Sequence, residues 1–100
     1  MSRKRPPTAA RRDANEPLIR EVFEVMGCNV ETLDLPCDLL VFDPVSDLII
    51  LVEVKNGRNA RLTPAEHRFH GKNPAANLWV VYDEEDAMNK LASWRREFGT

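Results

Sequence analysis

Apolar and polar residues follow one another along this chain in blocks, and their spacing switches between that of a helix and that of a strand. After a basic opening segment, apolar side chains recur every three or four residues from Leu18 to Met26, which predicts a helix. Asp13 or Asn15 can cap its start, and Gly27 is a natural stop. Short apolar runs bounded by turn residues then predict strands. The predicted strands are 28–34, 38–43, 48–55 and 77–82, and the later helices are 63–71 and 84–98.

The start of the second helix is the most clearly marked boundary in the sequence. Thr63 can cap it, Pro64 suits the first helical position, and Glu66 completes a capping box. Capping is therefore the role we expect first for Glu66. The order helix, three strands, helix, strand, helix predicts an α/β fold with a mixed four-stranded sheet flanked by helices. Trp79 and Trp94 fall in apolar stripes and are expected in the core.

Length and composition predict a single globular domain. The chain has 100 residues, of which 43% are hydrophobic and 30% charged. We assign residues 13–100 to the domain and residues 1–12 to a disordered basic arm, which is almost free of large apolar side chains. Because no membrane span and no secretory signal are apparent, we expect a cytoplasmic protein. Cys28 and Cys37 match no metal pattern and are expected as free thiols, with a disulfide left as an alternative.

The net charge of −2 conceals two basic segments. Residues 1–12 hold five cations and no acid, and residues 55–72 hold five cations and one acid. This distribution is typical of a protein that presents a localised surface to a polyanion, although a solvated tail and a solvated helix face would give the same pattern. The candidate phosphate contacts are Arg58, Arg61, His67, Arg68 and Lys72.

Two acidic residues are predicted to face each other across the hairpin of the second and third strands. Pairing of Asp43 with Leu48 across a short turn sets an antiparallel register. That register brings Asp38 opposite Glu53, with Cβ atoms roughly 4.5–5.5 Å apart, so the two carboxylates would repel. A divalent cation would convert the repulsion into binding, and Lys55 lies on the same face because side chains alternate. A slip of one residue would remove the arrangement.

An acid near the start of one strand, followed by an acid-x-Lys triplet on the next, resembles the PD-(D/E)XK nuclease superfamily. The matching residues are Asp38 in PCDLLV and Glu53-Val54-Lys55 in VEVKNG. The predicted order over residues 13–82 is similar to the restriction-endonuclease-like αβββαβ core, with the C-terminal helix as an addition. The stretches RRDANEPLIREVFEVMGCNV and LTPAEHRFH look most like those of small phage or bacterial VRR-NUC-like and Holliday-junction-resolvase-like nucleases.

Two positions depart from the pattern of the superfamily. Cys37 separates Pro36 from Asp38, so the "PD" pair is not contiguous, and only the acid takes part in the chemistry. Glu66 stands where the second helix of such proteins often carries a Gln. Any role of the Gln type is therefore in doubt at Glu66.

The resemblance implies an Mg²⁺-dependent endodeoxyribonuclease, with Mn²⁺ able to substitute, that cuts branched or junction DNA as a homodimer. Asp38, Glu53 and the backbone carbonyl of Val54 would hold the metal. Lys55 would orient or deprotonate the attacking water. Glu16 is the candidate additional acid, and helix capping is an equal alternative for it. A non-catalytic nucleic-acid-binding module with the same fold, or an unrelated small α/β partner protein, would also fit the sequence.

Overall fold

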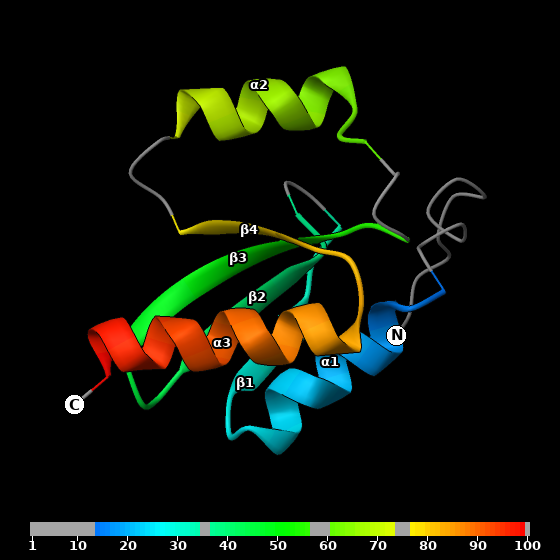
Figure 1. Cartoon of the computed structure of the whole chain (residues 1–100). Helices are drawn as coiled ribbons and strands as arrows, with labels where there is room; N and C mark the ends of the chain where they lie inside the picture. Colours follow the sequence, from blue (N-terminus) through cyan, green and yellow to red (C-terminus); the bar gives the residue numbers. More distant parts are fainter. Residues whose placement is uncertain (1–13, 35–36, 57–60, 74–76, 100) are drawn as a thin grey trace.

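One mixed sheet organises the parts of the chain that the computed structural model describes, which are residues 14–34, 37–56, 61–73 and 77–99. The sheet has the order β1-β2-β3-β4, in which the first three strands are antiparallel and β4 runs parallel to β3 (Figure 1). This arrangement confirms the predicted α/β fold and element order. The elements are α1 (Glu16–Val25), β1 (Asn29–Thr32), β2 (Leu39–Asp43), β3 (Leu48–Val54), α2 (Pro64–Lys72), β4 (Leu78–Val81) and α3 (Glu84–Phe98).

Several predicted features lie outside the described residues. They are the basic arm 1–12, the possible helix cap Asp13, Pro36 and the candidate phosphate contact Arg58. Within the described ranges, no helix is both long and apolar enough to cross a membrane. Cys28 and Cys37 are buried free thiols, as expected.

The core lies between the sheet and the pair α1 and α3. Ile19 and Phe23 of α1 and Leu91 of α3 are fully buried against the inward side chains of the strands. Trp79 and Trp94, which were expected in the core, are partly buried and pack against this cluster, with ring centroids 5.6 Å apart. Figure 1 shows α2 on the other side of the sheet from α1 and α3. The sheet is thus covered by two helices on its core face, and the opposite face meets α2.

The hairpin of β2 and β3 has the predicted register. Asp43 pairs with Leu48, and the ladder continues to the pair Leu39 and Val52. Just before the start of β2, the amide of Asp38 also donates to the Val52 carbonyl oxygen at 3.0 Å. Side chains alternate along β3, so Val52 enters the core while Glu53 points to the face where α2 lies.

The side chain of Asn15 does not cap α1, contrary to the expectation. Asn15 occupies the N-cap position without a side-chain cap bond. Its amide Nδ2 instead donates to the carbonyl oxygens of Lys55 at 3.2 Å and Tyr82 at 2.7 Å. Asn15 therefore joins the start of α1 to the carboxyl ends of β3 and β4.

Two apolar side chains near helix ends are exposed, and one helix ends later than predicted. Leu18 is 46% exposed and Phe98 is 49% exposed, because each lies in a terminal turn at the margin of the core. The second helix does not end at Gly71 but runs to Lys72. Gly71 keeps a helical backbone there, and Nδ2 of Asn73 donates to the Phe69 carbonyl oxygen at 2.8 Å. The predicted end of this helix was wrong by one residue.

A buried ion pair fastens α3 to the hairpin at the end of the sheet away from Lys55. Asp43, whose side chain has no exposed surface, accepts bonds from Arg95 Nη2 at 2.7 Å and Nε at 3.1 Å. Arg95 also donates to the Met26 carbonyl oxygen at 2.7 Å, and Ser46 Oγ donates to Asp43 at 2.7 Å. Burial opposes the charge of Asp43, but the bonds from Arg95 and Ser46 outweigh it and lower its pKa to about 2. The pair of Asp43 and Arg95 thus connects the end of α1, the hairpin turn and α3.

Candidate active site

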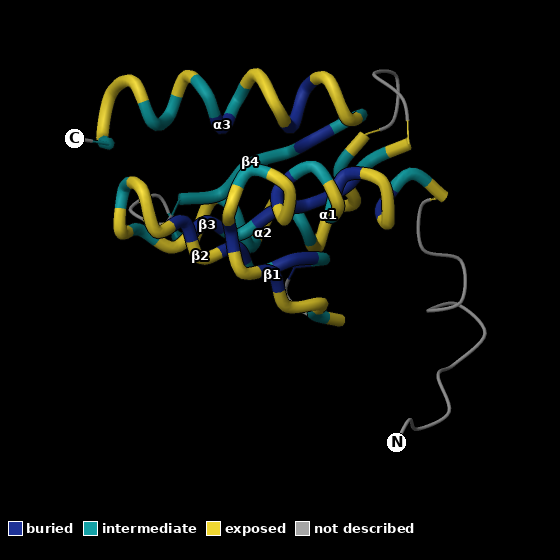
Figure 2. Tube along the Cα trace, turned by 90° about the horizontal axis from the view of Figure 1, so that it is seen from below, coloured by how far each residue is buried: buried dark blue, intermediate teal, exposed yellow. Residues whose placement is uncertain are grey.

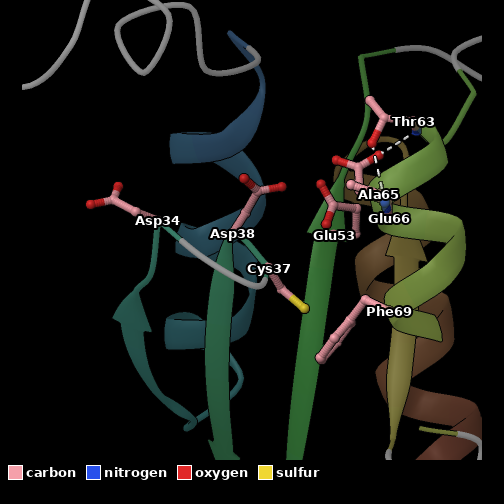
Figure 3. A pocket seen from close by; sticks show the side chains of 8 residues that line it. All are labelled: Asp34, Cys37, Asp38, Glu53, Thr63, Ala65, Glu66 and Phe69. Atoms are coloured by element: carbon pink, nitrogen blue, oxygen red, sulfur yellow. Dashed lines mark hydrogen bonds between the residues drawn. The ribbon is translucent and has the colours of Figure 1, made fainter. Parts of the chain in front are cut away.

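A pocket of about 370 Å³ opens between the start of β2, the end of β3 and the first turns of α2 (Figure 3). Asp38 and Glu53 both line it, which places the two predicted acids on the same side of the sheet. Glu66 and Phe69 line it from α2, and Cys37 lines it from the segment before β2 (Figure 3). The pocket therefore brings together residues from three separate elements.

The backbone of β3 holds the carboxylate of Asp38 in place. The Val54 amide donates to Asp38 Oδ2 at 2.7 Å. The amide of Asp38 donates in turn to the Val52 carbonyl oxygen, so the residue bonds to β3 through both its backbone and its side chain. The hydrogen-bond ladder of the hairpin thus fixes the carboxylate beside Glu53.

Glu53 is a buried carboxyl group among like charges. Only 5% of its surface is exposed. Burial, the hydrogen bond with Glu66 and the charge of Asp38 raise the pKa of Glu53 to about 9. The pocket therefore favours an additional positive charge next to Glu53, whether a proton or a cation.

Lys55 lies beside the acids, as predicted, although β3 ends one residue earlier, at Val54. Its Nζ is 2.8 Å from Glu66 Oε1 and 4.0 Å from Glu53 Oε2. Glu66 also completes the predicted capping box with Thr63. Burial opposes the charge of Glu66, but the bonds from Lys55 and the Thr63 amide outweigh it and lower its pKa to about 2.

Glu66 makes a contact in the site that the sequence analysis did not predict. Capping was the role expected first, and the capping box is confirmed. The contact with Lys55 adds a second role, since the same oxygen bonds both groups. Its place at the superfamily's Gln position was the one signal in the sequence that could have pointed to this contact.

Glu16, the candidate additional acid, lies at the first turn of α1 and is 8% exposed. Within the described ranges, Glu16 is not among the residues that line the pocket of Asp38 and Glu53. The neighbouring Asn15 bonds to the Lys55 carbonyl oxygen, so the start of α1 adjoins the end of β3. The geometry thus places Glu16 near this edge of the sheet and leaves its role a prediction.

The predicted phosphate contacts within the described residues all have exposed side chains. α2 contains no buried residue, and Figure 2 shows it as largely exposed. A polyanion that approached the pocket along α2 could reach these groups from solvent. They are Arg61, His67, Arg68 and Lys72.

The donor set of the pocket fits a hard divalent cation. In the part of the chain that the structure describes, no group of three or more His, Cys, Asp or Glu residues is arranged to hold a metal ion. Mg²⁺ often needs only one or two carboxylates, because water and substrate phosphates complete its shell. Asp38 and Glu53 supply two such carboxylates. Burial and the charges of Glu53 and Asp38 raise the pKa of Cys37 to about 12, so this thiol stays protonated and is a poor ligand.

We expect the affinity for Mn²⁺ to rise with pH. The pKa of Glu53 is raised to about 9, so below that pH a proton competes with the cation for its carboxylate. Affinity should increase up to about tenfold per pH unit between about pH 6 and pH 8. Titration of the protein with Mn²⁺, followed by electron paramagnetic resonance, measures this dependence. Glu53→Gln is the control and should flatten it, whereas pH-independent binding by the unaltered protein would contradict the assignment.

Comparisons with known proteins point to one fold. No protein-family model matches the sequence, and no curated protein matches it. A solved structure described as a VRR_NUC domain superposes on this chain with a TM-score of 0.62 and 28% sequence identity. The alignment covers 79% of this chain and 95% of that chain. The fold and the predicted resemblance are thereby confirmed.

Proposed function

We propose that this chain, whose fold is similar to that of a VRR_NUC domain, is a metal-dependent DNA endonuclease. The observation that carries the proposal is the meeting of Asp38, Glu53 and Lys55 at one edge of the sheet. Paired oxygen ligands beside an ammonium group are the parts that hydrolysis of a phosphodiester requires. The fold positions all three side chains through a single hairpin.

In this proposal Asp38 and Glu53 hold Mg²⁺ or Mn²⁺, and the carbonyl of Val54 contributes as well. Such an ion, when bound, would supply positive charge at the phosphoryl oxygen and would lower the pKa of a bound water. Lys55 orients the attacking water and stabilises negative charge on the phosphate in the transition state. An arginine would serve less well, since its guanidinium is broad and does not release a proton. Glu16 is the candidate for an additional acid at the edge of the site.

We propose that the substrate is DNA held mainly by its phosphates. Arg61, Arg68, Lys72 and His67 on and before α2, together with Arg58, would contact the backbone near the pocket. Phosphate contacts position a nucleic acid without reading its bases. Selection would then rest on the shape of the DNA, so we propose branched or junction substrates. Symmetric cuts in both strands would need two sites, for which a homodimer is the simplest arrangement.

A panel of DNA substrates tests the proposed activity. The protein is incubated with four-way junctions, flaps, nicked duplexes and linear duplexes, each with Mg²⁺, Mn²⁺ or EDTA. We expect cleavage that requires the metal and is faster on branched DNA than on linear duplex. Retention of DNA with no cleavage in either metal would instead favour a non-catalytic binding module.

A further inference from the structure

Among the described residues, an ion pair joins helix α2 to the edge of the sheet, and it ends at the candidate catalytic lysine. None of the residues of α2 is buried. Its first turn bonds to the residue that follows β3, since Glu66 Oε1 lies 2.8 Å from Lys55 Nζ. We propose that Glu66 is the positioning residue for Lys55. This inference rests on the proposed nuclease function and deepens it.

The ion pair orders a long side chain before the substrate arrives. The Lys55 side chain is 14% exposed and that of Glu66 is 20% exposed, so the pair is partly shielded from solvent. A free lysine side chain samples many rotamers, and holding it in one of them has an entropic cost. Because a fixed acceptor already orders the side chain in the folded protein, the ammonium group is preorganised for the reaction.

Glu66 is itself held by the backbone of its own helix. Its Oε1 accepts a bond from the Thr63 amide at 2.7 Å, and its amide donates to Thr63 Oγ1 at 3.2 Å. This reciprocal capping box fixes the carboxylate at the first turn of α2. The position of the ammonium group is therefore set by the start of the helix.

The ion pair also keeps Lys55 away from a carboxylate that the metal needs. Glu53 Oε2 lies 4.0 Å from Lys55 Nζ, against 2.8 Å for Glu66 Oε1. Glu66 is therefore the carboxylate within hydrogen-bond distance of the ammonium group, and Glu53 lies outside that distance. Glu66 thus separates the group that handles the water from the group that binds the metal.

Two substitutions separate the capping role from the positioning role. Glu66→Gln keeps an oxygen that can accept the Thr63 amide, so the capping box survives. Its neutral amide binds the ammonium group more weakly than a carboxylate does, because charge-assisted bonds are about twice as strong. Glu66→Ala removes both roles. Glu24→Gln is the matched control, since Glu24 forms an exposed ion pair with Arg20 on α1.

The test measures single-turnover cleavage, DNA affinity without metal, Mn²⁺ affinity and the thermal unfolding midpoint. For Glu66→Gln we expect the cleavage rate constant to fall by about 10- to 100-fold. Its affinities for DNA and for Mn²⁺ should stay within about twofold of those of the unaltered protein. Its unfolding midpoint should stay within about 2 °C. The cleavage rate constant of Glu66→Ala should fall by a similar factor, and this variant should also unfold at a lower temperature. Glu24→Gln should match the unaltered protein throughout.

Three results would overturn the inference. Full cleavage by Glu66→Gln would show that Lys55 needs no carboxylate to hold it. A large loss of Mn²⁺ affinity in Glu66→Gln would make Glu66 a metal ligand instead. Failure of the unaltered protein to cut any substrate would remove the proposed function and this inference with it, and that result is separate from the first two.

Discussion

Asp38→Asn should abolish metal-dependent cleavage, with a loss of about 1,000-fold or more in rate. The change removes the negative charge with which Asp38 would hold the cation next to Glu53. The Asn oxygen can still accept the Val54 amide, which donates to Asp38 Oδ2 at 2.7 Å, so the hairpin should keep its geometry. Lys55→Ala should lose cleavage as well, because the water and the phosphate would have no ammonium group beside them. Cleavage of a labelled junction in single turnover measures both effects.

Binding and folding controls make the result specific to the chemistry. Both variants should retain DNA in a gel-shift assay without metal, and Asp38→Asn should show weakened Mn²⁺ affinity. Asp47→Asn is the matched control, because it makes the same chemical change in the hairpin turn at the other end of β2 and β3. Asp47 has a φ of 62°, a left-handed conformation that Asn adopts readily. Robust cutting by Asp38→Asn or Lys55→Ala would contradict the assigned site.

Asp43→Asn should lower the free energy of unfolding by roughly 3 kcal/mol. The substitution leaves the Arg95 guanidinium, whose side chain is only 19% exposed, without its counter-charge. It also weakens the bonds from Ser46 that hold the hairpin turn. Urea unfolding followed by circular dichroism measures the loss. Glu24→Gln, which breaks an exposed ion pair with Arg20, should cost less than about 1 kcal/mol.

The same ion pair should shape the stability of the protein in acid. The pKa of Asp43 is lowered to about 2, so its stabilising charge is fully present above the ordinary carboxyl pKa of about 4. This part of the stability is lost as the pH falls from about 4 towards about 2. Asp43→Asn should therefore lose less stability over that range than the unaltered protein. An equally steep acid dependence in both proteins would show that other groups are responsible.

Much of the fold could be predicted from the sequence because helix starts, short turns and the alternation of side chains along strands depend on neighbouring residues. The capping box of Thr63 and Glu66 marks the start of α2 within four successive residues, and the structure contains it. The pairing of Asp43 with Leu48 follows from the short turn between them. Once that pair is set, the period of two along each strand leaves no choice about which face Glu53 occupies. Helix ends were less certain, since Gly71 can continue a helix as well as end one.

Part of the site did not follow in the same way. Asn15 suits an N-cap by residue type, yet its amide bonds to the ends of two strands. Glu16 is an acid in the first turn of α1, and the sequence around it does not predict which way its buried carboxylate faces. The contacts of Asn15 and the direction of the Glu16 side chain depend on where α1 packs on the sheet, and that packing involves segments far apart in the sequence.

The sequence by itself determined the elements, the hairpin register and the placement of Asp38, Glu53 and Lys55 on one face, because each follows from spacing within a short stretch. Only the tertiary structure decided that Glu66 of α2 bonds to Lys55 and that Arg95 bonds to Asp43, 52 positions earlier. Those contacts depend on how whole helices pack against the sheet. Packing sums many weak interactions between remote residues, so no local spacing rule encodes the result.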